Sequence, residues 1–130
     1  MDNIKTVSIE PWLTIKDGEE AVKFYKTAFN ATETYRLQEP GGGLVVRLSV
    51  YGAGFWISGG TSDDNNVNAP LGGNDLRMIL IIDEPDNFFA QALKAGGTEI
   101  FPVGEEHGWR LGRLSDPFGL HWEIGHQLSL

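Results

Sequence analysis

The first part of the chain changes from a two-residue to a helical hydrophobic period. In TVSIEPWLTI (residues 6–15), apolar positions alternate with others, which predicts a strand with one face on a core. Its expected core face carries Val7, Ile9, Leu13 and Ile15. DGEEAVKFYKTAF (residues 17–29) has helical spacing, with Asp17 as the expected N-cap. Further strands are predicted at residues 32–38, 44–51 and 55–59.

The same order of elements starts again after a polar stretch. Residues 61–74 contain few apolar side chains and several turn formers, which predicts a linker. A strand is expected at residues 76–83, followed by a helix at 84–97 with Pro85 in its first turn. Three more strands are predicted, at residues 98–103, 109–114 and 120–125.

The two halves also match in detail. The pair Thr-Glu recurs at residues 32–33 and 98–99, and Gly52 corresponds to Gly119. This repetition predicts a tandem duplication. The expected fold is α+β, with two tandem βαβββ modules forming a barrel-like cleft and the helices outside. Each half is too small to bury its sheet alone, so the two are expected to share a concave face.

Composition narrows the possible functions. The chain has 130 residues and a formal net charge of −8, which argues against binding to nucleic acid or to anionic membranes. It has no cysteine, so disulfides, zinc–thiolate sites and thiol catalysis are excluded. We find no signal-peptide pattern and no apolar run of about 20 residues that would span a membrane. We therefore expect a cytoplasmic protein.

Two segments carry a family resemblance: PWLTIKDGEEAVKFYKTAFNA (residues 11–31) and GWRLGRLSDPFGLHWEIG (residues 108–125). With the repeat, they resemble the glyoxalase/bleomycin resistance/dioxygenase superfamily, also called the vicinal oxygen chelate (VOC) superfamily. The chain looks most similar to its small, PhnB-like bacterial members. The resemblance implies one VOC domain over residues 1–130, with module one at about 5–60 and module two at about 75–126. Dimers are common in the superfamily, so a homodimer is expected.

The resemblance also places a metal at four positions, which here are Glu10, Trp56, Arg77 and Glu123. A divalent metal needs three or four nitrogen or oxygen ligands. Arg77 offers no lone pair, and Trp56 is only a donor. The sequence therefore predicts no metal and no other cofactor.

The two glutamates are the catalytic candidates. Glu10 or Glu123 is either a base in the pocket or one half of a structural ion pair. Because Arg77 occupies a matching position, it is expected to pair with Glu123 and to lie between the two carboxylates. If Arg77 takes only one of them, the other is free to act as a base.

Other side chains are candidates for substrate binding, each with a structural alternative. Trp12 and Trp56 either stack on a flat ligand or fill the former metal cavity. Arg47 and His121 either contact the ligand or are held by neighbouring side chains. Trp109 and Arg110 either grip a substrate at the pocket mouth or pack at an edge. Two weaker motifs are a Glu105–Glu106–His107 metal site and Gly41–Gly43, which is interpreted as a hairpin turn.

Two functions follow from this. The first is a binding protein of the bleomycin-resistance type, with a metal-free pocket for a small, planar or apolar ligand, a cationic one among the alternatives. The second is a lyase or isomerase of the glyoxalase type, with Glu10 or Glu123 as base. Whether the protein is an enzyme stays open at this point, as does whether the cleft forms within one chain or across a dimer.

Overall fold

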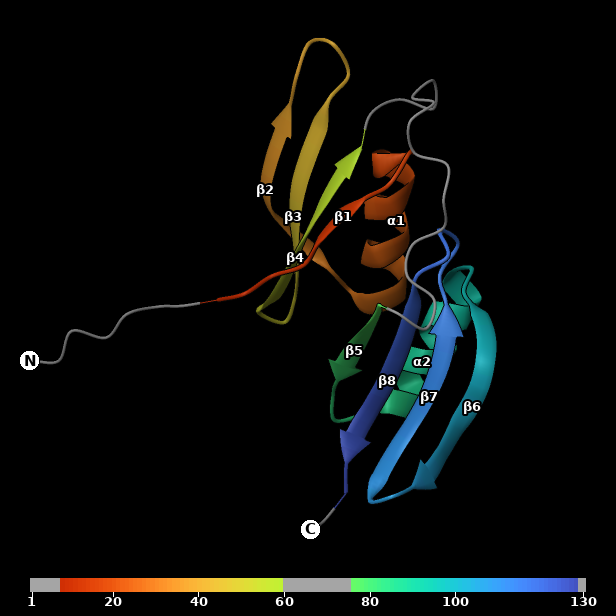
Figure 1. The fold of residues 1–130 in the computed structure, drawn as a ribbon. Helices are drawn as coiled ribbons and strands as arrows, with labels where there is room; N and C mark the ends of the chain where they lie inside the picture. Colours follow the sequence, from red (N-terminus) through yellow and green to blue (C-terminus); the bar gives the residue numbers. More distant parts are fainter. Residues whose placement is uncertain (1–7, 60–75, 129–130) are drawn as a thin grey trace, which may run out of the picture.

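The computed structural model describes residues 8–59 and 76–128. Their elements follow the predicted order twice (Figure 1). Module one contains β1 (Trp12–Thr14), α1 (Gly18–Phe29), β2 (Thr32–Gln38), β3 (Leu44–Val50) and β4 (Ala53–Gly59). Module two contains β5 (Arg77–Ile81), α2 (Pro85–Ala95), β6 (Thr98–Glu106), β7 (Trp109–Ser115) and β8 (His121–Gln127). The predicted α+β fold of two βαβββ modules is confirmed.

Each module builds one four-stranded sheet with the same topology. The strand orders are β1-β4-β3-β2 and β5-β8-β7-β6. In both sheets the first strand pairs in parallel with the last, and the other neighbours are antiparallel. Thr32 opposite Ser49 in module one matches Thr98 opposite Ser115 in module two. The two halves therefore repeat in register as well as in order.

Local signals explain the helix boundaries. The Asp17 side chain accepts a hydrogen bond from the Glu20 backbone N–H at 3.2 Å, as expected of an N-cap. Asn30 ends α1 in the left-handed conformation, with φ of 59°. Helix α2 starts at Pro85, whose missing N–H costs nothing in a first turn, and it ends at Gly96, with φ of 130°.

The first strand is shorter than predicted. Only Trp12–Thr14 pair as a strand, and the side chain of Ile9 is almost fully exposed rather than in the core. Pro11 is one physical reason, because proline has no N–H to donate to a neighbouring strand. Val7 and the linker predicted at residues 61–74 lie outside the described residues.

The two modules meet through their helices and a shared aromatic core. Helix α1 packs against α2, and the ring of Phe29 on α1 lies 4.7 Å from that of Trp122 on β8. Asp116, which follows β7, accepts hydrogen bonds from the Tyr25 hydroxyl at 2.6 Å and the Trp122 Nε1 at 3.0 Å. Burial and the neighbouring Asp116 carboxylate raise the pKa of Tyr25 well above its usual range. A buried polar network therefore fixes one module against the other.

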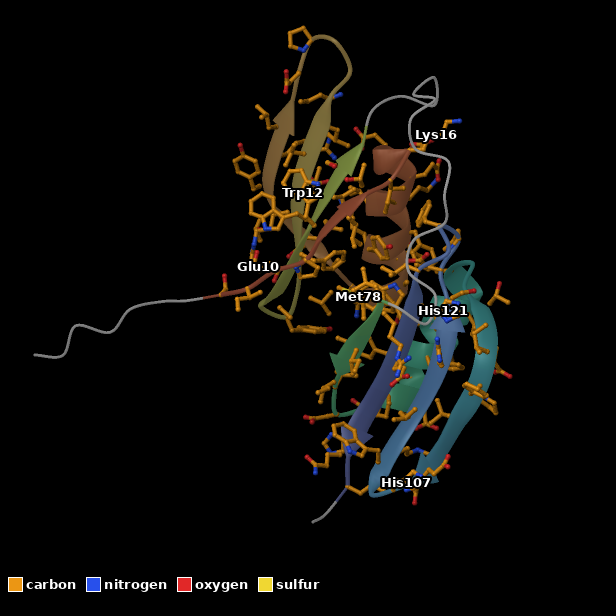
Figure 2. All side chains as sticks on the ribbon, in the orientation of Figure 1. Glu10, Trp12, Lys16, Met78, His107 and His121 are labelled. Atoms are coloured by element: carbon orange, nitrogen blue, oxygen red, sulfur yellow. The ribbon has the colours of Figure 1, made fainter. Side chains whose placement is uncertain are left out.

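Each sheet has one face covered by helices and one open face. Phe55, Ile57, Trp122 and Ile124 point to the helices and are buried. Residues that alternate with them, such as Trp12, Trp56, His121 and Glu123, point to the other side. Glu10 and Trp12 lie on the side of β1 away from α1 (Figure 2). We call these helix-free sides the open faces. Among the described strands the two sheets share no pairing, and the contact between the modules does not cover their open faces.

Candidate functional site

A row of four side chains crosses the open face of module one. Strand pairing places Tyr35, Arg47, Trp56 and Trp12 next to one another, one from each strand. The Trp12 and Trp56 rings are stacked, with centroids 6.1 Å apart and 17° between their planes. Tyr35 extends the row, with its centroid 5.6 Å from that of Trp56. This aromatic row suits a flat ligand, because offset rings attract planar groups.

Glu10 lies beside this row and is held from two sides. Its carboxylate accepts two hydrogen bonds from Arg47, at 2.8 and 2.6 Å, and one from Trp56 Nε1 at 2.8 Å. The hydrogen bond with Arg47 is the main reason why the pKa of Glu10 falls from 4.5 to about 2. The prediction that Arg77 also neutralises Glu10 is wrong, because the pairing of β3 with β4 brings Arg47 to Glu10 instead.

The open face of module two carries the equivalent row. Phe101, Arg113, Glu123 and Ile79 are neighbours across β6, β7, β8 and β5. Trp56 and Glu123 are therefore equivalent, and so are Arg47 and Arg113. Counting back two residues from Trp12 and Ile79 gives Glu10 and Arg77. The register thus supports the assignment of Glu10, Trp56, Arg77 and Glu123 to matching positions of the two modules.

Glu123 forms the predicted ion pair. Arg77 Nε lies 2.8 Å from a Glu123 carboxylate oxygen, with side chains 37% and 17% exposed. His121 lies on the same face, and its Nδ1 accepts a hydrogen bond from Arg113 Nε at 3.1 Å. A cavity of about 410 Å³ opens here, lined by Phe101, Leu111, Arg113 and Glu123 among others.

The donor set does not fit the superfamily's metal. Of the four matching positions, Arg77 is a permanent cation and Trp56 presents an N–H. The two remaining carboxylates already accept hydrogen bonds or an ion pair from arginines. In the described part of the chain, no three His, Asp or Glu side chains are grouped as metal ligands would be.

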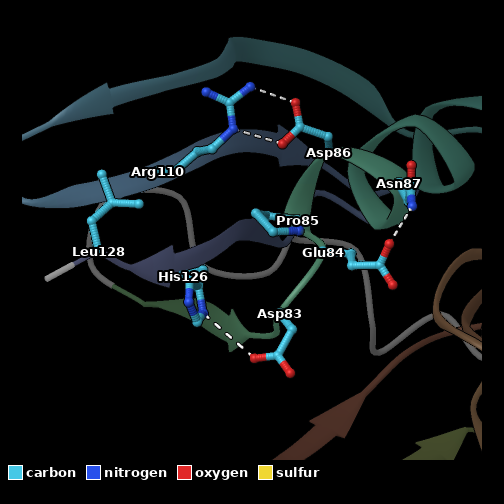
Figure 3. Close-up of a pocket in the computed structure, with 8 residues that line it drawn as sticks. All are labelled: Asp83, Glu84, Pro85, Asp86, Asn87, Arg110, His126 and Leu128. Atoms are coloured by element: carbon cyan, nitrogen blue, oxygen red, sulfur yellow. Dashed lines mark hydrogen bonds and ion pairs between the residues drawn. The ribbon is translucent and has the colours of Figure 1, made fainter.

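Trp109 and Arg110 do not line one site together. They are consecutive in β7, so they point to opposite faces of the sheet. Arg110 lies on the helix side, where it donates two hydrogen bonds to Asp86 at 2.7 and 2.6 Å (Figure 3). It lines a separate cavity of about 430 Å³ at the start of α2, with His126 and Asp83. Arg110 therefore does not lie on the open faces that carry Glu10 and Glu123.

The weaker metal motif, Glu105–Glu106–His107, lies at the tip of the β6–β7 hairpin. His107 has a φ of 52° and is the exposed end of the turn, away from Glu10 and His121 (Figure 2). Gly41–Gly43 lie between β2 and β3, where Glu39 N–H donates to the Gly43 carbonyl at 2.8 Å. That contact supports a hairpin turn.

Sequence reasoning missed Tyr35, Phe101 and Asp116. The first two occupy equivalent places in the rows, and each lies opposite an arginine of the neighbouring strand. The alternation along β2 places Tyr35 on the same face as Arg47. The sequence does not show which residue of β3 lies opposite Tyr35, so it does not show the row. Asp116 had a visible signal, since it starts the Asp-Pro-Phe-Gly turn between β7 and β8.

Comparisons with known proteins agree with this architecture. No family profile matches the chain. The Mycobacterium bovis protein Mb0911c, described as uncharacterized, is 32% identical over 127 residues, which cover 91% of this chain and 82% of that protein. The Mycobacterium tuberculosis protein Rv0887c, also described as uncharacterized, has the same identity, with 73% of its length covered.

Solved structures share the fold at lower identity. Fosfomycin resistance protein FosX from Listeria monocytogenes superposes with a TM-score of 0.74 at 16% identity, covering 98% of this chain and 97% of FosX. A FosX variant has been solved with Mn(II) and 1S,2S-dihydroxypropylphosphonic acid. A glyoxylase/bleomycin resistance protein/dioxygenase domain from Frankia sp. EAN1pec gives 0.75 at 14% identity, covering 96% and 93%. The chain therefore belongs to the family of these mycobacterial proteins, and it has the fold of FosX and of the Frankia glyoxylase/bleomycin resistance protein/dioxygenase domain.

Proposed function

We propose that this chain is a small-molecule-binding member of the VOC superfamily, of the PhnB-like bacterial type, whose open faces form a metal-free ligand site. The observation that carries the proposal is that the two carboxylates at the expected metal positions are already paired with other side chains of the protein. Glu10 is held by Arg47 and Trp56, and Glu123 is held by Arg77. A metal would have to displace these arginines to gain two ligands. We also propose that residues 1–130 form a single domain.

The aromatic row supports a planar or apolar ligand. Trp12 and Tyr35 are about half exposed although they belong to an ordered stack. A flat ring placed on this row would bury apolar surface on both partners, which favours binding. Trp56 is fixed by its hydrogen bond to Glu10, so the row is organised before the ligand arrives.

The four tryptophan indoles provide a direct test. We would screen flat aromatic fragments by NMR and follow the Nε1–H signals of the indoles. A ligand on the row is expected to shift the signals of Trp12 and Trp56, while that of buried Trp122 stays in place. Replacing Trp12 by Ala should weaken binding at least severalfold. Fragments that shift neither Trp12 nor Trp56 would contradict the proposed site.

A second copy of the chain is the proposed partner. The open faces expose Trp12 (54%), Tyr35 (47%), Ile79 (59%) and Phe101 (58%) at equivalent positions of the two rows. Apolar groups gathered in this way mark interaction surfaces. Because the modules are alike, a twofold dimer covers both faces at once, with module one of each copy against module two of the other. Two closed ligand sites would result.

Oligomeric state tests this arrangement. Light scattering coupled to size-exclusion chromatography is expected to give a dimer for the native chain and a monomer for Ile79→Lys. The matched control is Asn87→Lys, which adds the same charge on α2, away from both open faces. It should stay dimeric. A native monomer at all concentrations, or a dimer that survives Ile79→Lys, would contradict the proposal.

A metal-free lyase or isomerase is the second candidate function. The low pKa of Glu10 favours Glu123 as its base. A carboxylate with a pKa of about 2 is a weak proton acceptor near neutral pH, which disfavours Glu10. Glu123 lies next to a cavity and on the same face as His121. If the chain catalyses a proton transfer, Glu123→Gln should abolish turnover. Loss of turnover in Glu10→Gln alone would assign the base to Glu10 instead.

A further inference from the structure

We infer that a second groove, at the junction of the two modules, binds a small organic cation, an ammonium group carried on an apolar chain or ring. The turn between β3 and β4 lies at the end of module one that faces β5 (Figure 1). A groove of about 440 Å³ opens there, lined by this turn, the end of β5 and the start of α2. None of its lining residues belongs to the rows on the open faces, so the inference goes beyond the proposed function.

The walls of this groove are apolar and aromatic. Val50 and Leu80 are buried, and Ile82 is partly buried. The ring of Phe88 on α2 lies 6.1 Å from that of Tyr51, with 65° between the ring planes. Two rings at such an angle suit a cation, because the face of an aromatic ring carries partial negative charge. The size of the groove fits a small molecule.

Tyr51 is held in a conformation that is costly for its residue type. Its φ is 51°, in the left-handed region that bulky side chains avoid, and Gly52 follows with φ of 97°. A turn with two such angles favours asparagine at the first position. Asn30 Nδ2 donates to the Tyr51 hydroxyl at 3.2 Å, and Gln91 Nε2 donates to Asn30 Oδ1 at 2.9 Å. Both modules therefore fix a ring that is 73% exposed, as expected of a wall that meets a ligand.

The charged groups that line the groove are carboxylates. In the described part of the chain they are Asp83 and Glu84, and no lysine or arginine lines it. Glu84 is the N-cap residue of α2 but makes no side-chain cap hydrogen bond. Its carboxylate accepts a hydrogen bond from the neutral amide of Asn87 at 2.9 Å (Figure 3). That contact leaves the negative charge of Glu84 in place for a ligand.

Neighbouring positive groups do not reverse this charge. His126 lies 3.6 Å from Asp83, so its protonated form cancels one of the two negative charges. The N-terminus of α2 adds a positive partial charge of about half a unit. Arg110 donates to Asp86 and lines the other cavity at the start of α2. The groove therefore stays negative even when His126 is protonated, and an ammonium group complements it.

Three probes with the same phenyl ring separate charge from shape: phenethylammonium, 2-phenylethanol and phenylacetate. Dissociation constants would be measured by NMR titration at low salt, from the backbone amide signals of Tyr51 and Phe88. Glu84→Gln removes the charge and keeps an oxygen for Asn87, and Tyr51→Asn removes the ring and suits the turn. Glu106→Gln is the matched control, because it removes the same charge at the far end of β6. Melting temperatures would show that each variant is folded.

We expect phenethylammonium to bind at least about fivefold more tightly than 2-phenylethanol, the combined effect of one cation–π contact and one exposed ion pair. Phenylacetate should bind most weakly. Glu84→Gln and Tyr51→Asn should each reduce the preference for the cation by about twofold or more, since each removes one of these contacts. Glu106→Gln should leave it unchanged.

The outcomes separate this inference from the proposed function. If 2-phenylethanol binds as tightly as phenethylammonium, or if Glu106→Gln loses the preference equally, the cation inference is overturned. Shifts of Trp12 and Trp56 without shifts of Tyr51 and Phe88 would also overturn it, because they would place the probe on the open face. If no probe binds at millimolar concentration, the inference fails, whereas the site on the open faces keeps its own test at Trp12 and Trp56.

Discussion

At the scale of single residues, pairing decides what each charged side chain can do. Sequence reasoning identified Glu10, Glu123, Arg47 and Arg77, and it predicted the ion pair between Arg77 and Glu123. It assigned Glu10 to the wrong arginine, because strand alternation gives the face of a side chain but not its partner on the next strand. That partner depends on register, which the Trp12–Trp56 and Arg47–Trp56 pairings set.

The depressed pKa of Glu10 predicts how its contribution to stability changes with pH. The value falls from 4.5 to about 2 on folding, so the charged carboxylate stabilises the native state above pH 4.5. This contribution should be lost as the pH falls through about 2. The difference in unfolding free energy between the native chain and Glu10→Gln should therefore shrink over that range. Urea denaturation at several pH values measures it.

A second glutamate serves as the comparison for that experiment. Glu33 also has a pKa of about 2, because its carboxylate is hydrogen-bonded to Arg36. Glu33→Gln should show the same pH dependence without involving the open face. A Glu10→Gln difference that is flat from pH 7 to pH 2, beside a normal response for Glu33→Gln, would argue against the Arg47–Glu10 pair.

Removal of one buried hydroxyl should destabilise the fold strongly. Tyr25→Phe takes away the donor to Asp116, a buried carboxylate, and hydrogen bonds to charged groups contribute about 1.5–3 kcal/mol. The same change at Tyr35, which is about half exposed, should alter stability by no more than about 0.5 kcal/mol. Chemical denaturation compares the two variants. Equal effects would mean that the Tyr25–Asp116 contact contributes little.

At the scale of elements, the hydrophobic period predicted every helix and strand that the structure describes. The strand at residues 32–38 matches β2 throughout, since its boundaries are marked by Ala31 and Glu39 with turn formers beyond. The predicted length of the first strand was too great. The alternation of apolar residues continues through Pro11, but proline has no N–H to donate to a neighbouring strand, and the strand begins only after it. Hydrophobic periodicity describes one segment of the chain at a time. It therefore predicts single helices and strands more readily than the rows of side chains that cross several strands.

Gly54 on β4 should control the geometry of the Arg47–Glu10 pair. The Arg47 guanidinium lies over Gly54, where an added Cβ would collide with it. Gly54→Ala is therefore expected to displace Arg47 and raise the pKa of Glu10 from about 2 toward 4.5. NMR titration of the Glu10 carboxyl measures this shift. Gly41→Ala, where an added Cβ meets nothing within 4 Å, is the control. An unchanged pKa in Gly54→Ala would contradict the expected displacement.

At the scale of the whole molecule, duplication explains both the fold and the position of the site. The repeat in the sequence predicted two equivalent modules, and the pairings show that the equivalence extends to individual residues of each row. What the sequence did not reveal is how the modules meet, because the Tyr25–Asp116 contact joins residues that are 91 positions apart. None of the described helices is long and apolar enough to span a membrane.

We propose that arginine and tryptophan stand on these faces at positions where related proteins carry metal ligands. Native mass spectrometry, with Mn(II), Ni(II), Zn(II) or Fe(II) added and then removed by a chelator, tests it most directly. We expect no stoichiometric metal adduct, whether the protein is a monomer or a dimer. A one-to-one adduct that the chelator removes, and that Glu10→Gln or Glu123→Gln abolishes, would contradict it.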